Sequence, residues 1–259
     1  MAGRSKKKTK MSIKLPFSTV DEVLEGQVLV FDKPLTWTSF DVVNKVRGTL
    51  KHTFNLRKVK VGHAGTLDPL ATGVLILCIG RKTKTIETLQ AEEKTYTGVI
   101  RLGITTPSFD AETEIDRWGD ATRIGTLELD SIVDAANHLT GDLDQMPPQF
   151  SAKKVDGVVA YNAARKGKTV NLKPKAVQVY SFDITGMTSA TVGEHPVVDV
   201  SFEIKCSKGT YIRALARDLG LGLKVGGTLT ELRRTKSGNF AVENAYDLQK
   251  FITTVKSLA

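Results

Sequence analysis

Gly62-His-Ala-Gly-Thr-Leu-Asp-Pro-Leu-Ala-Thr-Gly73 is the most distinctive stretch of this chain, and an apolar run, Val74–Ile79, follows it directly. Three glycines and a proline surround a single carboxylate, Asp68. Glycine lets the backbone approach a ligand closely, and Pro69 restricts the conformation of the residue before it. The flanking leucines predict a partly desolvated site, where an ionised carboxylate needs a charged partner. By composition alone, a turn-stabilising Asp68 is still favoured by about two to one.

The segments around this loop predict an α+β fold with one continuous sheet. Residues 197–206 alternate between apolar and polar side chains, which is typical of a strand with one solvated face in an antiparallel or mixed sheet. Thr38-x-x-Asp41 is a capping box ahead of a helix over about 38–50, and Thr210 is a candidate cap for a second helix. Further strands are expected at about 28–31, 74–79, 94–102, 176–186 and 228–235, and further helices at about 126–140, 158–166, 210–220 and from 245.

The net charge of +9 is unevenly distributed along the chain. Residues 1–14 hold six basic groups and no acid, and residues 151–175 and 205–236 each have a net charge of +6. Residues 108–144 hold ten acids against two arginines, a net of −8. A single charged run is usually a solvated face, but this polarised set favours a protein that binds nucleic acid with one side.

Several classes of protein are disfavoured by what the sequence lacks. It contains no GxxxxGK[ST], HExxH, CxxC or GxSxG motif, and its glycine-rich stretch at 220–227 follows a helix rather than a strand. No apolar run approaches the roughly 20 residues of a membrane helix, and no secretory signal is present. The two cysteines lie in apolar strand-like segments without metal-ligand spacing, which indicates a reducing, cytoplasmic location.

Four motifs in one order across about residues 25–250 resemble the TruB family of tRNA pseudouridine synthases, in a short bacterial form. They are DKP with TS near 32–39, GHAGTLDPLATGVL at 62–75, KTYTG at 94–98 and CSKGTYIRALARDLG at 206–220. The resemblance implies a pseudouridine synthase fold, with helices flanking a central mixed, antiparallel-rich sheet and an RNA-binding cleft. It also implies the activity, which is conversion of uridine 55 in the T loop of tRNA to pseudouridine without cofactor or metal.

The same resemblance implies roles for seven residues. Asp68 is the expected nucleophile that starts cleavage of the bond between ribose and uracil, and Arg213 is the arginine that pairs with it. Tyr96 is expected to stack on the target base and take the carbon-5 proton. The expected substrate-binding residues are His63, Leu232, Tyr211 and Lys33.

Two of these residues bear on how the target base is reached. A stacked uridine must be extruded from the T loop before Asp68 can contact it. The resemblance implies that His63 enters the RNA to fill the vacated space and that Leu232 packs under the uracil. Without the resemblance, His63 is a structural histidine, Leu232 is a core residue and Arg213 belongs to an exposed stripe. For Tyr96 the pattern alone favours a core aromatic and a site residue about equally.

We expect a basic, disordered tail over residues 1–24 and one catalytic domain over 25–259, with no C-terminal PUA domain. Residues 145–175 are expected to be a mobile insertion that closes over the RNA stem-loop. One departure from the family motif is Thr36, which replaces a glycine and puts the local turn and the role of Lys33 in doubt.

The expected partner is the T stem-loop of tRNA, bound by a monomer with no obligatory protein partner and no membrane association. Two alternatives remain open. One is a non-catalytic module that folds tRNA, which would need neither Asp68 nor Arg213. The other is a dyskerin-like catalytic subunit, which relies on guide RNA and partner proteins.

Overall fold

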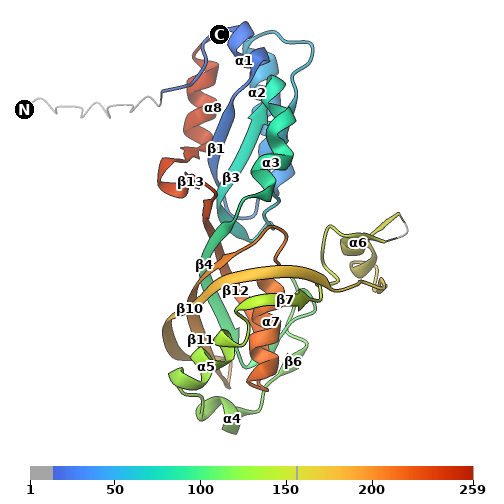
Figure 1. The fold of residues 1–259 in the computed structure, drawn as a ribbon, viewed down its shortest axis with the longest axis vertical. Helices are drawn as coiled ribbons and strands as arrows, with labels where there is room; N and C mark the ends of the chain where they lie inside the picture. Colours follow the sequence, from blue (N-terminus) through green and yellow to red (C-terminus); the bar gives the residue numbers. More distant parts are fainter. Residues whose placement is uncertain (1–13, 156, 259) are drawn as a thin grey trace, which may run out of the picture.

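A computed structural model of the chain describes residues 14–155 and 157–258, and its backbone is an elongated α+β structure around one large sheet (Figure 1). The sheet has ten strands, and its main path runs β14-β1-β3-β12-β4-β11-β10-β7. The pairs β1–β14 and β3–β12 are parallel and the others are antiparallel, so the expected mixed, antiparallel-rich sheet is confirmed. The strands of the path are β1 (Val28–Lys33), β3 (Ala71–Ile79), β4 (Lys94–Leu102), β7 (Gly141–Gln145), β10 (Lys175–Val192), β11 (His195–Cys206), β12 (Gly227–Ser237) and β14 (Tyr246–Asp247).

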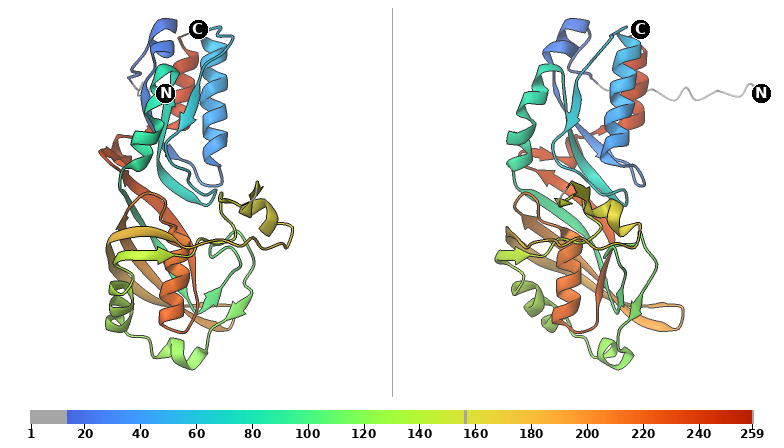
Figure 2. Two further views of the ribbon diagram at one scale, coloured as in Figure 1. Left: turned by 45° about the vertical axis from the view of Figure 1, so that its right-hand side comes forward. Right: turned by 90° about the vertical axis from the view of Figure 1, so that its right-hand side faces the viewer.

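The upper half of the molecule is built on β3, which has apolar side chains on both faces. Helices α2 (Ser39–Thr53) and α8 (Leu248–Lys256) cover one face, and α3 (Ile86–Ala91) lies on the other side (Figure 2). Leu75 and Leu77 therefore belong to the main core, whereas Val74 and Ile76 pack in a second cluster against α3. The predicted capping box of α2 is present, with Thr38 and Asp41 bonded to each other's backbone N–H.

The lower half contains the long β10–β11 hairpin, with α7 (Ile212–Gly222) packed against β12. Tyr211 is the N-cap of α7, so the expected cap at Thr210 is wrong: the Thr210 hydroxyl bonds the Ser207 carbonyl instead. The helix expected at 126–140 is present as the shorter α5 (Leu129–Asn137), and a separate short helix that was not predicted, α4 (Ala121–Gly125), precedes it. Two further short strand pairs are β5 (Ile104–Thr105) with β6 (Arg117–Trp118), and β8 (Lys154–Val155) with β9 (Val158–Val159).

The tail predicted over residues 1–24 is too long, because the folded part of the chain begins before residue 25. Residues 1–13 lie outside the described part of the chain, but Phe17 is buried and packs edge-on against Phe54 and Phe251, at 6.0 and 6.2 Å between ring centroids. Helix α1 (Val20–Glu25) follows, with a capping box of Thr19 and Glu22. The folded part therefore starts before residue 25, because an apolar side chain anchors this segment to the core.

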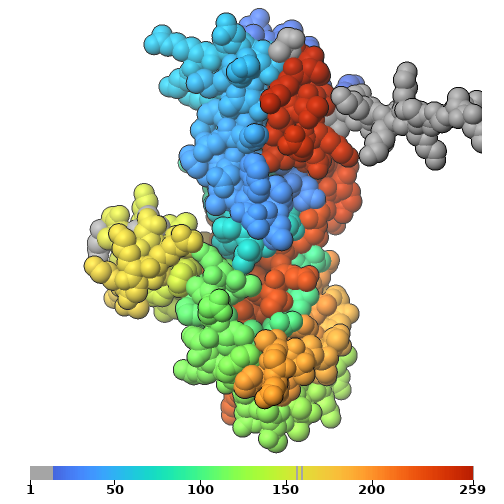
Figure 3. Space-filling view, turned by 180° about the vertical axis from the view of Figure 1, so that it is seen from behind, coloured from blue at the N-terminus to red at the C-terminus, as the bar shows by residue number. Residues whose placement is uncertain are grey.

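The insertion predicted at residues 145–175 projects from the side of the molecule (Figure 3). It carries the β8–β9 hairpin and helix α6 (Ala160–Ala164). Among the described residues, every helix is too short or too polar to cross a lipid bilayer.

Candidate active site

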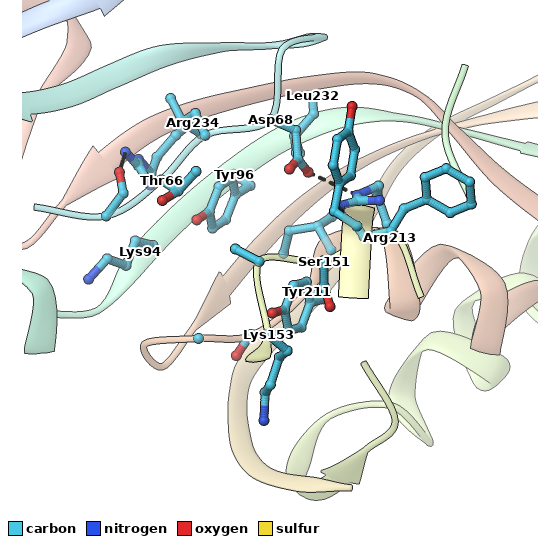
Figure 4. A pocket seen from close by; sticks show the side chains of 18 of the residues that line it. Thr66, Asp68, Lys94, Tyr96, Ser151, Lys153, Tyr211, Arg213, Leu232 and Arg234 are labelled. Carbon is cyan, nitrogen blue, oxygen red and sulfur yellow. Dashed lines mark hydrogen bonds and ion pairs between the residues drawn. The ribbon is translucent and has the colours of Figure 1, made fainter. Parts of the chain in front are cut away.

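A hollow of about 500 Å³ lies where the loop before β3 faces the start of α7, with β4 and β12 along its side (Figure 4). Five of the seven predicted site residues line it: Asp68, Tyr96, Tyr211, Arg213 and Leu232. The insertion adds part of the wall through Phe150, Ser151, Ala152, Lys153 and Tyr161. Segments more than 140 residues apart in sequence therefore meet in one pocket, as the Asp68–Arg213 contact shows.

Asp68 and Arg213 form an ion pair at the pocket wall. Arg213 Nε donates to Asp68 Oδ2 at 2.8 Å, and the two side chains are 5% and 37% exposed. The other guanidinium nitrogens donate to the backbone carbonyls of Ser108 at 3.0 Å and Phe150 at 2.9 Å. Guanidinium stays charged when buried and here has a fixed orientation, so it can orient the Asp68 carboxylate while leaving it partly open to the pocket.

A second carboxylate, that of Asp110, forms an ion pair with the same guanidinium. Its Oδ2 is 3.4 Å from Arg213 Nε, and its side chain is 7% exposed. Burial raises the pKa of Asp110, and the nearby Arg213 charge opposes that rise. Asp110 belongs to the acidic stretch that appears in the sequence as a solvated face, so no local pattern marked it as part of the site.

Ser39 and Lys33 fix the loop that carries Asp68 through hydrogen bonds to its backbone. Ser39 Oγ accepts from the Leu67 N–H at 2.8 Å and donates to the Leu67 carbonyl at 3.2 Å. Lys33 Nζ donates to the carbonyls of Pro69 at 3.1 Å, of Pro34 at 3.0 Å and of Trp37. Lys33 is fully buried and does not line the pocket, and burial lowers its pKa to about 8. The structure therefore places Lys33 beneath the Asp68 loop rather than in the pocket wall, and its expected contact with substrate stays a prediction.

The turn at Thr36 keeps the backbone conformation that glycine usually supplies. Thr36 has a φ of 69°, and its N–H donates to the Pro69 carbonyl at 2.9 Å. The replacement of the motif glycine therefore leaves the contact between this turn and the Asp68 loop in place.

Strands β4 and β12 supply the flat side of the pocket. Tyr96 on β4 is opposite Arg234 on β12, and Leu232 is opposite Gly98. Burial raises the pKa of Tyr96, an effect that the neighbouring Arg234 charge opposes. Arg234 is 1% exposed and donates to the carbonyls of Val74 at 2.7 Å and Gly65 at 3.1 Å. The role of Arg234 was not predicted, because its partners are backbone carbonyls of residues 65 and 74, which are distant in sequence.

Gly73 explains how β3 can lie so close to β12. It has a φ of 100°, and a Cβ at this position would be 2.2 Å from the Arg234 carbonyl oxygen. Any side chain would push the two strands apart. The last glycine of the quoted stretch is therefore required for the position of Leu232 and Arg234 beside Asp68.

Tyr211 is held at the start of α7 by one amide side chain. Its N–H donates to Gln145 Oε1 at 2.8 Å, and Gln145 Nε2 donates to its carbonyl at 3.1 Å. Gln145 is 4% exposed, so this clamp is protected from water. Burial also raises the pKa of the Tyr211 phenol.

His63 lies outside the wall of this pocket, at the end of β2 (Val61–His63). Its Nδ1 is buried and has no hydrogen-bond partner among the described residues. Burial lowers the pKa of its imidazole, and the Arg234 charge acts in the same direction. The ring is therefore uncharged at neutral pH.

No group of three or more histidine, cysteine or acidic side chains suited to a metal ion occurs in the described parts of the chain. Cys78 and Cys206 are both free and buried.

Comparison with known proteins identifies the family. The sequence model described as "TruB family pseudouridylate synthase (N terminal domain)" matches residues 51–212, and that described as "tRNA pseudouridylate synthase B C-terminal domain" matches residues 213–257. The tRNA pseudouridine synthase B of Flavobacterium johnsoniae is 45% identical over 234 residues, which cover 90% of this chain and 97% of that protein. The enzyme of the same name from Bacteroides thetaiotaomicron is 47% identical over 227 residues, 88% of this chain and 92% of that protein.

Solved structures agree with this assignment. The structure titled "Structure of H/ACA RNP bound to a substrate RNA containing 2'-deoxyuridine" matches with a TM-score of 0.62 and 26% identity, over 89% of this chain and 53% of that chain. A Cbf5-Nop10-Gar1 complex matches with a TM-score of 0.62 and 27% identity, over 89% and 54%. This chain thus spans about half the length of those two. From the matches to both sequence models and to relatives along most of their length, the chain belongs to the TruB family of pseudouridylate synthases.

Proposed function

We propose that this protein converts uridine 55 in the T loop of tRNA to pseudouridine, with Asp68 as the catalytic carboxylate. The observation that carries the proposal is the Asp68–Arg213 pair in the wall of a pocket of about 500 Å³. The relatives named tRNA pseudouridine synthase B support the substrate class. A module that only refolds tRNA would have no use for a half-exposed carboxylate held by a buried guanidinium.

The reaction is an isomerisation, so its atoms balance within the nucleotide. The bond from ribose C1′ to uracil N1 breaks, the base rotates, and a bond from C1′ to C5 forms. C5 then loses its proton and N1 gains one. The Asp68 carboxylate acts at the glycosidic bond, and Arg213 orients it through the bond of 2.8 Å from its Nε to Asp68 Oδ2.

The remaining residues are assigned by their position in the pocket. Tyr96 offers a ring face for stacking on the uracil and receives the carbon-5 proton. Burial raises the pKa of its phenol, and the Arg234 charge beside it limits that rise. Leu232 packs under the base, and Tyr211 forms the wall at the start of α7. His63 is outside the pocket, where its uncharged ring can stack in the RNA and offset part of the few kcal/mol of extrusion.

The test is an assay of the purified chain alone on an unmodified tRNA transcript, with pseudouridine mapped by position. We expect one modified site, uridine 55, without guide RNA or added protein. Asp68→Asn should abolish product while leaving tRNA affinity within about tenfold. The matched control is Asp183→Asn, which makes the same change on an exposed position of β10.

Each failure of this assay has a distinct meaning. Full activity of Asp68→Asn would remove Asp68 from the chemistry. An inactive wild-type protein that gains activity with a guide RNA would favour the dyskerin-like alternative. Binding and refolding of tRNA without any pseudouridine would favour the non-catalytic module.

A further inference from the structure

Three lysines, Lys153, Lys175 and Lys208, gather at one edge of the pocket and are called the lysine cluster below. Lys153 belongs to the pocket wall, as does Gly209, which directly follows Lys208. The Lys175 ammonium lies against Gly209, because a Cβ on that glycine would be 2.0 Å from Lys175 Nζ. Lys175 Nζ also donates to the Lys208 carbonyl at 3.4 Å. The insertion, the start of β10 and the loop before α7 therefore bring one lysine each to the same place.

The charges of the lysine cluster act on one another rather than on a carboxylate. Burial lowers the pKa of Lys175, and the charges of Lys153 and Lys208 lower it further. In the described part of the chain, none of the three forms an ion pair with an acidic side chain. Like charges that gather without a counter-charge repel one another, and an anion bound between them would remove that repulsion. The cluster therefore has the electrostatics of an anion-binding site.

The lysine cluster lies across Tyr211 from the catalytic carboxylate. In Figure 4 the Lys153 ammonium points away from Asp68, on the far side of the Tyr211 ring. Asp68 already has a guanidinium 2.8 Å away, so the lysines are not needed to balance its charge. Lys175 is half-buried and Lys208 exposed, and both lie outside the pocket wall, at its rim. The base of an extruded nucleotide enters the pocket, whereas its charged phosphate stays at the rim, within reach of these ammonium groups.

We infer that the lysine cluster binds a backbone phosphate of the target nucleotide and so holds that nucleotide at the mouth of the pocket. The inference rests on the proposed function and adds a substrate contact to it. An ammonium binds phosphate as a point charge and has three donors. Lys175 therefore keeps two N–H groups for an anion after its bond to the Lys208 carbonyl.

The first test compares Lys175→Gln and Lys208→Gln with Lys224→Gln in the intact chain. Each substitution removes one positive charge, but Lys224 is exposed and lies beyond the end of α7 that is far from the pocket. We expect either cluster variant to weaken binding of a T-arm stem-loop at low salt by about 3- to 10-fold, the effect of one lost phosphate contact. Lys224→Gln should bind as the wild type does, and none of the three should lower the thermal midpoint.

A substitution on the RNA identifies the phosphate. An uncharged methylphosphonate replaces the phosphate either 5′ or 3′ of the target uridine, with a 2′-deoxy sugar on its 5′ side to keep the link stable. Each reference RNA has the same sugar and a normal phosphate, and binding is measured in the Asp68→Asn background, where bound RNA is not converted. We expect Lys175→Gln to have no further effect on one of the two methylphosphonate RNAs, because the contact that it removes is already absent there. On the other RNA its effect should be complete.

Two results would overturn the inference and leave the proposed function intact. One is wild-type RNA affinity in either Lys175→Gln or Lys208→Gln. The other is an equal loss of affinity for both methylphosphonate RNAs and for their references, which would mean that the lysines act only through the overall charge of the surface. An inactive wild-type protein would instead remove the proposed function itself, whatever its affinity for RNA.

Discussion

Arg213 is the residue on which the geometry of the site depends. Its guanidinium joins the Asp68 loop, the 108–110 segment and the insertion at Phe150, over sequence separations of 145, 105 and 63 residues. The Asp68–Arg213 pair was predictable only through resemblance to a family, because each residue alone fits a plainer role. Asp110 was not predictable at all, since its burial results from tertiary contacts made by an acidic, irregular segment.

Thr36 offers a test of backbone strain at a single residue. A β-branched residue at a φ of 69° has a higher energy than glycine there, because its Cβ is too close to the following carbonyl. We expect Thr36→Gly to raise the free energy of unfolding by about 0.5–1 kcal/mol, a gain reduced by the greater freedom of glycine in the unfolded chain. Urea denaturation measures this difference.

Asn55 supplies the comparison for that substitution. It is exposed and has a φ of 47°, but asparagine tolerates this conformation. Asn55→Gly should therefore change stability less than Thr36→Gly. A Thr36→Gly protein that is less stable than the wild type would show that the threonine side chain stabilises the turn.

Among the secondary-structure elements, those with strong periodicity were the ones predicted well. The alternating residues 197–206 form β11, the apolar run at 74–79 forms most of β3, and the capping box begins α2. The insertion was less predictable, because its short elements depend on contacts with distant residues. Its position rests on Glu112, which lies outside it in sequence and accepts hydrogen bonds from Tyr161 at 2.5 Å and Arg165 at 3.0 Å.

These contacts predict that Glu112 holds the insertion against the pocket. The Tyr161 and Glu112 side chains are largely shielded, and Arg165 also lies over the Tyr161 ring at 4.8 Å. Glu112→Gln removes the charge that strengthens both bonds. We expect trypsin to cleave the variant several-fold faster after Lys153, Lys154 and Arg165, and the amides of residues 151–165 to exchange faster.

Glu93→Gln is the control for this substitution. Glu93 pairs with Lys205 at 2.9 Å on the exposed surface, away from the insertion, so its loss should leave the cleavage pattern unchanged. Equal cleavage of the wild type and Glu112→Gln would show that the insertion is held by other contacts, such as the Phe150 carbonyl on Arg213.

At the scale of the whole molecule, a basic groove and an acidic helix lie at opposite ends of the long axis. The upper half carries a basic groove of about 480 Å³ whose charged lining is Arg47, Lys51, Arg57, Lys58 and Lys60. This groove adjoins β2, which leads directly to His63 and the Asp68 loop. The acidic helix α5, which carries Asp130 and Asp134, lies at the opposite end (Figure 1). The acidic stretch at 108–144 was predicted from the sequence, but the basic groove follows from the fold, because residues 47–60 form one surface only when α2 and β2 are adjacent.

This arrangement predicts that phosphates of the bound RNA lie along the basic groove. Each phosphate contact releases counterions, so the logarithm of affinity falls with the logarithm of salt concentration by about 0.7–0.9 per contact. We expect Lys58→Gln to weaken tRNA binding at low salt and to make that slope shallower by about 1. Lys224→Gln removes the same charge beside α4, where Arg123 donates to the neighbouring Leu223 carbonyl, and should leave the slope unchanged. Equal slopes for the wild type, Lys58→Gln and Lys224→Gln would place the RNA away from the groove. Residues 60–63, which connect the groove to the Asp68 loop, would then not lie along the bound RNA.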